Sequence, residues 1–69
     1  MTWTPDPVRT SPMRWLGYDA AGKRVAFIAA CPEGWLWHAE RPDGTDKAAF
    51  SASETAAKRD ATAWLEPPG

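Results

Sequence analysis

Residues 34–44 read GWLWHAERPDG, and this stretch decides the fold. Trp35 and Trp37 are two positions apart, so on a strand their side chains project from the same face. Residues 41–44, RPDG, favour a tight turn, because Pro presets the second position of a type I turn, Asp suits the third, and Gly accepts backbone angles that other residues avoid. A strand that enters this turn must fold back on itself, so we predict an antiparallel hairpin.

Three further segments have the β-branched, aromatic or alternating pattern of strands. With the hairpin strand, the expected strands cover residues 13–18, 24–31, 34–40 and 45–50. In the second segment, Val25 and Phe27 share a face with Ala29 and Cys31. Turn residues separate the segments at 19–22 and 31–34.

After residue 50, the spacing of apolar residues changes from the alternation of a strand to the period of a helix. Ser51 and Glu54 have the spacing of a capping box, and residues 52–65 are good helix sequence. Glu54 and Lys58 form a favourable i,i+4 pair. An apolar stripe runs at helical spacing through Ala57, Ala61, Trp64 and Leu65. We therefore predict an α+β fold: a three- to four-stranded antiparallel meander with one C-terminal helix packed on one face.

The chain is divided by its prolines into three parts. Residues 1–12 contain Pro5, Pro7 and Pro12 and are expected to form an extended arm, because proline interrupts both helices and strand pairing. Residues 13–66 form the single domain, and residues 67–69 are a tail after the helix. Trp3 is the large side chain of the arm, and it docks either on its own domain or on a partner.

The composition limits how 69 residues can be stabilised. Chains of this size bury only about 60% of their unfolded surface. Cys31 is the only cysteine and His38 the only histidine, so neither an intramolecular disulfide nor an ordinary structural zinc site is expected. Large side chains must supply the core, and these are Trp3, Trp15, Tyr18, Phe27, Trp35, Trp37, Phe50 and Trp64.

The charges are balanced, with eight Lys and Arg against nine Asp and Glu. This balance argues against a protein that binds mainly by neutralising phosphates. No apolar run approaches the roughly 20 residues of a membrane span, and residues 1–12 do not resemble a signal peptide. The sequence therefore predicts a cytoplasmic protein that does not bind membranes.

Two interpretations apply to Trp35 and Trp37. They either form the core beneath the helix, with Val25, Phe27 and Ala57, or they make a stacking platform on the open sheet face. The core interpretation is favoured, although five tryptophans are hard to bury under one helix, so at least one is expected on the open face or the arm. The candidate binding residues are Trp3, Arg14, Trp35, Trp37 and Arg41.

Catalytic chemistry is not expected. Cys31 and His38 flank a turn and could approach each other, but no third group orients them and no oxyanion site is evident. A buried thiol and a surface histidine is the simpler interpretation. Basic residues are interspersed with acidic ones, which favours a mixed solvated surface over a basic patch. We predict no enzyme activity, no catalytic residues, no metal and no cofactor.

The combination of GWLW at 34–37, PDG at 42–44 and FSASETAAK at 50–58 resembles a recurring hairpin-plus-helix pattern. It is similar to the arm-type DNA-binding domains at the N-terminus of phage and transposon integrases, in which three strands pack on one helix. It also resembles small proteins of phages and mobile elements built on this frame, some of which inhibit host defence. The integrase domains read DNA with basic strands, whereas the predicted strands of this chain carry Glu40 and Asp46. This departure argues against DNA binding.

Our functional prediction is a non-enzymatic protein-binding module that inhibits or adapts a large host complex, in the manner of an anti-defence protein. It depends on the resemblance and on the surplus of tryptophan, a residue type that dominates binding hot spots. The alternative is a nucleic-acid-binding module that stacks bases on Trp35 or Trp37 and holds phosphates with Arg14, Arg24 and Arg41. A homodimer through the open face and sugar binding by an exposed Trp are further alternatives.

Overall fold

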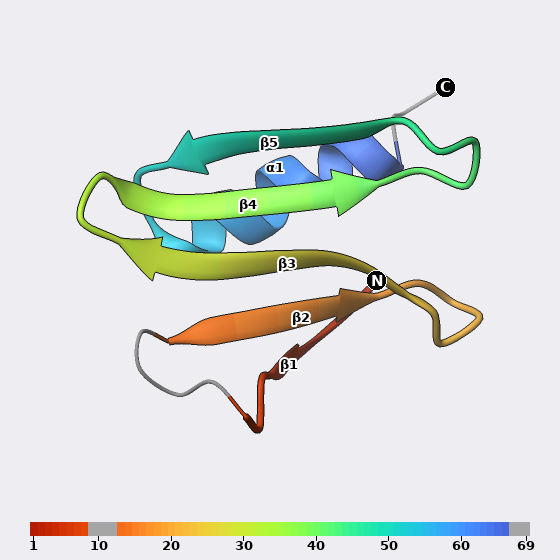
Figure 1. Cartoon of the computed structure of the whole chain (residues 1–69), viewed down its shortest axis with the longest axis horizontal. Coiled ribbons are helices and arrows are strands. Elements are labelled where there is room, and N and C mark those ends of the chain that lie inside the picture. The colour runs from red at the N-terminus through yellow and green to blue at the C-terminus, as the bar shows by residue number, and fades with distance from the viewer. Residues whose placement is uncertain (9–12, 67–69) are drawn as a thin grey trace.

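A computed structural model of the chain describes residues 1–8 and 13–66 (Figure 1). Five antiparallel strands form one sheet in the order β1-β2-β3-β4-β5, and a single helix follows them. The elements are β1 (Thr2–Pro5), β2 (Arg14–Tyr18), β3 (Arg24–Cys31), β4 (Gly34–Glu40), β5 (Asp46–Ser51) and α1 (Glu54–Leu65). The predicted α+β class and meander are confirmed, with five strands in place of three to four.

The additional strand is β1, which lies within the predicted arm. Trp3 pairs with Gly17 of β2, so at least Thr2–Pro5 belong to the domain, and the predicted boundary after residue 12 is wrong at this point. Pro5 ends an edge strand, where a missing N–H costs no ladder hydrogen bond. Residues 9–12 of the predicted arm and the tail at 67–69 lie outside the described residues.

The turn between β4 and β5 has the predicted chemistry. The Gly44 amide donates to the Arg41 oxygen at 3.0 Å, and the Arg41 amide donates to the Thr45 oxygen at 2.8 Å. Oδ1 of Asp43 accepts hydrogen bonds from the Thr45 amide and hydroxyl at 2.9 and 2.6 Å. Gly44 has a φ of 90°, a conformation that side chains disfavour. The hairpin is therefore closed by its own turn residues.

The helix begins two residues later than predicted, and its cap differs from the expected capping box. Ser53 is the N-cap, and its hydroxyl accepts a hydrogen bond from the Ala56 amide at 3.1 Å. Ser51 belongs to β5 instead, and its hydroxyl donates to Asp60 Oδ2 at 2.7 Å. With Ser53 as the cap, Glu54 stands in the first helical turn, where a carboxylate is favoured by the helix dipole.

Glu54 also joins the start of the helix to β2. Its Oε1 accepts a hydrogen bond from Trp15 Nε1 at 2.8 Å, while its Oε2 lies 3.4 Å from Lys58 Nζ, as the i,i+4 spacing predicts. Lys58 Nζ in turn lies 3.6 Å from the centre of the Trp15 ring. The three side chains thus tie the helix to a strand that it does not cover.

The core lies between the helix and one sheet face, which we call the helix face. In Figure 1, α1 runs behind β3, β4 and β5. The core residues are Ala26, Ile28, Trp37, Ala39, Ala57 and Ala61, with Ile28, Ala39 and both helix alanines fully buried. The alanines of the predicted stripe allow the helix backbone to approach the sheet closely. Trp37 is 4% exposed, so the core interpretation of this residue is confirmed.

All five tryptophans pack on or against this one core. Trp3, Trp15, Trp35 and Trp64 are partly buried and surround the cluster that contains Trp37. The expectation that at least one would occupy the open face or a free arm is wrong, because β1 and β2 extend the helix face beyond the helix. The expected partners Val25 and Phe27 are also wrong: Ala26 and Ile28 turn toward the helix instead.

The opposite side of the sheet, which we call the open face, is not covered by any described helix. The register places one row of side chains across all five strands and a second row across four. The first row is Thr4, Leu16, Phe27, His38 and Ala48, and the second is Arg14, Ala29, Leu36 and Phe50. Phe50 is 56% exposed, whereas Leu16 is buried between its neighbours. In the described part of the chain, no helix combines the length and apolar content that crossing a membrane requires.

Candidate functional site

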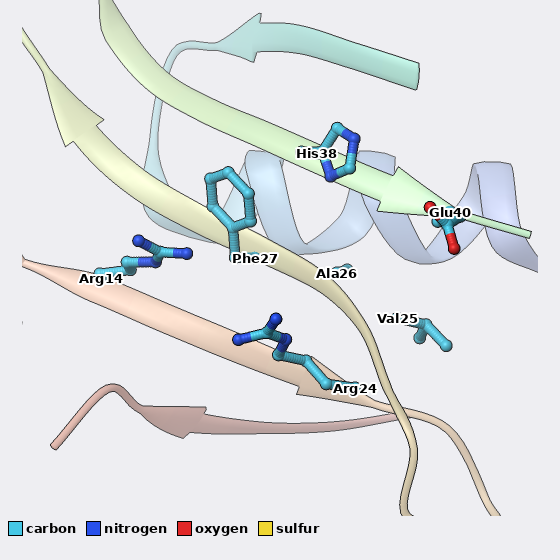
Figure 2. Close-up of a pocket in the computed structure, with 7 residues that line it drawn as sticks. All are labelled: Arg14, Arg24, Val25, Ala26, Phe27, His38 and Glu40. Carbon is cyan, nitrogen blue, oxygen red and sulfur yellow. The ribbon is translucent and has the colours of Figure 1, made fainter. Parts of the chain in front are cut away.

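The open face carries a hollow lined by the first residue of β2, the first half of β3 and the end of β4 (Figure 2). The hollow has a volume of about 230 Å³. The residues that line it include two arginines, a carboxylate, an imidazole and apolar residues: Arg14, Arg24, Val25, Ala26, Phe27, His38 and Glu40. This concave, mixed lining makes the hollow the candidate functional site.

Arg24 reaches the hollow because of an irregularity in β3. Gly17 pairs with Ala26, but the next residue of β2, Tyr18, pairs with Arg24, so Val25 is left without a partner. A bulge of this kind places two successive residues of one strand opposite a single position of its neighbour. Simple alternation would turn Arg24 toward the helix face with Ala26. The bulge instead directs its side chain into the hollow, and Figure 2 shows the guanidinium extending toward Arg14.

Arg14 is held in place by contacts on two sides. Its guanidinium centre lies 4.3 Å from the centre of the Phe27 ring, which is the geometry of a cation–π interaction. Its Nε lies 3.6 Å from Asp6 Oδ2, an ion pair whose carboxylate is largely buried. Asp6 directly follows β1, and its amide donates to the Arg14 oxygen at 2.9 Å. The segment that the sequence assigned to a separate arm therefore positions a residue of the hollow.

A second set of contacts extends from Phe27 toward β5. The Phe27 and His38 ring centres are 5.5 Å apart, and His38 Nε2 lies 3.0 Å from Asp46 Oδ2. Arg14, Phe27, His38 and Asp46 consequently form a continuous chain of contacts across four strands. Such a chain fixes the rotamers of side chains that would otherwise be free on a solvent-facing sheet.

An apolar area borders the hollow on the same face. Ala29, Leu36 and Phe50 are neighbours across β3, β4 and β5, in the row that begins with Arg14. Phe50, the aromatic residue of this row, is largely exposed. The open face thus places the charged groups of the hollow beside an apolar area.

The structure separates the five residues that the sequence marked as binding candidates. Arg14 lies in the hollow, while Trp3, Trp35 and Trp37 lie on the helix face. Trp37 has no exposed ring to offer a base, and Trp35 packs against the core cluster. Arg41 lies at the end of the helix, where its Nε and Nη2 donate to the Trp64 oxygen at 3.2 and 2.8 Å. Only Arg14 therefore belongs to the site.

The other basic residues are dispersed, as the mixed-surface interpretation expects. Lys58 covers the Trp15 ring, Arg59 lies 3.5 Å from Asp60, and Lys47 pairs with Ala39 on the helix face. Arg14 and Arg24 are the two arginines that meet in the hollow. Arg24 also lines a smaller neighbouring hollow with Lys23 and Arg41, where Asp19 and Glu40 lie among them. Within residues 1–8 and 13–66, the basic side chains are therefore interspersed with acidic ones and form no continuous basic patch.

Cys31 and His38 do not come together. Cys31 pairs with Gly34 and His38 pairs with Phe27, so the two side chains are separated by four residue positions along β3. At about 3.3 Å per residue this separation is about 13 Å, too far for proton transfer between them. Within residues 1–8 and 13–66, no three His, Cys, Asp or Glu side chains cluster in a way that could hold a metal ion.

Sequence reasoning missed the part that Phe27 and Phe50 play and assigned Phe27 to the core. The alternation of side chains along a strand shows which of its residues share a face. It does not show which side of the sheet that face is on. The presence of Arg24 in the hollow depends on the bulge at Val25. Position 25 is neither proline nor glycine, so the sequence gives no local indication of the bulge.

Comparison of the chain with protein-family models, with curated proteins and with solved structures gave no match.

Proposed function

We propose that the protein is a non-enzymatic protein-binding module whose contact surface is the open face. One observation carries this proposal: the face opposite the helix is left uncovered by the described elements and presents the exposed Phe50 beside the hollow that contains Arg14 and Arg24. Aromatic residues and arginine are the types most enriched at protein–protein interfaces.

The size of the face supports a single, compact interface. Seen as in Figure 1, the molecule extends 33 by 23 Å in the plane of the sheet. This is the scale of the roughly 800 Å² that each partner buries in a standard interface. The partner would therefore cover most of the open face, with Phe50 in its apolar part and the hollow near its centre.

The nucleic-acid alternative has less support. It required Trp35 or Trp37 as a stacking platform and Arg41 on a phosphate, but these side chains lie on the helix face and at the helix end. Arg14 and Arg24 share the hollow with Glu40, which repels a polyanion. Inhibition of a host complex and a phage or mobile-element source stay predictions from the resemblance.

The test is affinity capture from a lysate of the cells that encode the chain, using matched variants of β5. Phe50→Ser changes the open face, whereas Lys47→Ser changes an exposed residue of the same strand on the helix face. We expect the wild-type and Lys47→Ser proteins to capture the same partner, and Phe50→Ser to lose it. Both variants alter solvent-exposed side chains and should stay folded, which circular dichroism would check.

Two results would contradict the proposal. Capture that is equally strong with Phe50→Ser would move the interface away from the open face. Failure of all three proteins to retain a specific partner, together with a monomeric mass at high concentration, would remove both the protein-binding module and the homodimer.

A further inference from the structure

We propose that the hollow receives a single carboxylate side chain of the protein partner, held by Arg14 and Arg24. This inference rests on the proposed function of the open face and specifies the chemistry of the partner. Guanidinium groups present several N–H donors in a plane and match the two oxygens of a carboxylate.

Arg24 is the cation available to a ligand. Within the described residues it makes no hydrogen bond or ion pair, and its side chain lies in the hollow (Figure 2). Its direction is the consequence of the bulge at Val25, and bulges commonly re-aim side chains beside binding sites. A partner carboxylate would therefore meet an unpaired charge without breaking an existing contact.

Arg14 is the preorganised cation. The Phe27 ring lies against its guanidinium group, and Asp6 Oδ2 forms an ion pair with its Nε at 3.6 Å, without a hydrogen bond. These contacts reduce the side-chain entropy that a long side chain loses on binding. Nη1 and Nη2 of Arg14 are the donors that remain for a ligand.

The positions of the charged groups in the hollow would set the orientation of a bound partner segment. Figure 2 places Arg14 at one side of the hollow and Glu40 at the other, with the side chain of Arg24 between them. A partner segment would thus place its carboxylate between the arginines and a hydrogen-bond donor or a basic group near Glu40. A nucleic acid, which repeats its negative charge, would bring a second phosphate toward this carboxylate.

The volume distinguishes a side chain from a larger ligand. The hollow holds about 230 Å³. An apolar cavity of about 150 Å³ can contain benzene, so a Glu or Asp side chain has room. Sites for small-molecule ligands and cofactors usually occupy about 300–1,000 Å³. The hollow is below this range, which favours a side chain presented by a protein.

The experiment selects binders for the immobilised protein from a displayed library of random linear peptides. Affinities of the enriched peptides are then measured for the wild type, Arg24→Gln, Phe50→Ser and Lys47→Gln. We expect the peptides to share an acidic residue at one fixed position, and Arg24→Gln to weaken them about ten- to hundredfold, since a charge-assisted hydrogen bond contributes about 1.5–3 kcal/mol. Lys47→Gln is the matched charge-removal control and should leave affinity unchanged.

A double-mutant cycle makes the assignment specific. Replacing the shared acidic residue of the peptide by its amide should weaken binding to the wild type more than it weakens binding to Arg24→Gln, in which Arg14 is the only arginine left to hold the carboxylate. Additive losses would show that the carboxylate binds elsewhere and would overturn the inference.

The other outcomes separate this inference from the proposed function. Peptides that depend on Phe50 but share no acidic residue would overturn the carboxylate site and leave the open face as the interface. Absence of enriched peptides, or peptides insensitive to both Phe50→Ser and Arg24→Gln, would overturn both. A single-stranded oligonucleotide whose binding Arg24→Gln abolishes, with no acidic peptide selected, would assign the hollow to phosphate instead.

Discussion

Arg41 Nη2 donates a 2.8 Å hydrogen bond to the main-chain oxygen of Trp64, and its guanidinium centre lies 3.9 Å from the centre of the same residue's indole ring. The last turn of α1 contains no basic residue of its own. Arg41 follows β4 directly, so the hairpin supplies the positive charge that favours the C-terminus of a helix.

Replacement of Arg41 should therefore destabilise the fold rather than affect binding alone. We expect Arg41→Gln to lower the free energy of unfolding by about 1–3 kcal/mol, because a charge-assisted hydrogen bond and a cation–π contact are both lost. Arg41→Lys should be intermediate, since an ammonium group cannot stack and bond in the same geometry. Urea denaturation followed by circular dichroism would measure this, with the exposed Arg59→Gln as a control near zero.

Trp64 closes the core at the end of the helix. Trp64→Ala should destabilise by about 3 kcal/mol, at the lower limit for buried tryptophan because the side chain is only partly buried. The main-chain oxygen that Arg41 contacts is retained in this variant. Combination with Arg41→Gln should thus give a loss smaller than the sum of the single losses, and strict additivity would contradict the stacking contact.

Gly17 is required by the position of Trp3. A Cβ atom at residue 17 would lie 2.9 Å from two carbon atoms of the Trp3 ring, closer than side chains tolerate. Gly17→Ala should displace Trp3 and destabilise by about 1–3 kcal/mol. In a Trp3→Ala background, Gly17→Ala should lower the free energy of unfolding by much less. Chemical denaturation of the wild type, the two single variants and the double variant would measure this difference. An equal cost in both backgrounds would mean that the ring does not cover Gly17.

The two serines before the helix should respond differently to replacement. Ser53→Ala removes the N-cap and should cost about 1 kcal/mol, with faster amide exchange at Ala56. Ser51→Ala removes the hydrogen bond to Asp60 but leaves the cap, so exchange at Ala56 should not change. In the capping box expected from the sequence, the Ser51 hydroxyl would accept from the Glu54 amide. Faster exchange at Glu54 in Ser51→Ala, with no effect of Ser53→Ala at Ala56, would therefore contradict Ser53 as the cap.

The β4–β5 turn should depend on pH through Asp43. The hydroxyl and amide of Thr45 donate to its carboxylate and hold the pKa of Asp43 below its ordinary value. Because the pKa is lower in the folded state, this contribution to stability is present above the ordinary pKa and is lost as the pH falls through the lowered one. An NMR titration of the carboxyl carbon should show that Thr45→Val raises this pKa, and an unchanged titration would contradict the role of the hydroxyl.

The turn at residues 41–44 and the stripe of helix alanines were predictable because local chemistry decides both. Gly44 supplies the required backbone conformation, and Ala57 and Ala61 recur at the helical period. β1 was not predictable in the same way. Pro5 and Pro7 argue against pairing in general, yet an edge strand tolerates proline at its end, and only the contact between Trp3 and Gly17 shows that this strand is used.

The candidate site was less accessible to sequence reasoning than the fold. It depends on register, since Phe27 faces away from the helix only because Ile28 pairs with Trp37. It also depends on the unpaired Val25, which turns Arg24 to the open face. Arg14, which the sequence marked as a binding candidate, lines the hollow, but its neighbours there follow from long-range pairing that no local pattern indicates.

The gathering of every indole on one side of the sheet has a consequence for optical experiments. Tryptophan emission will respond strongly when the core opens, so it is a suitable signal for folding and refolding kinetics. The open face carries phenylalanine, histidine and arginine instead, and a ligand seated there would leave the emission almost unchanged. Fluorescence quenching would thus overlook a true ligand of the hollow, and a tryptophan introduced at Phe50 would supply the missing reporter.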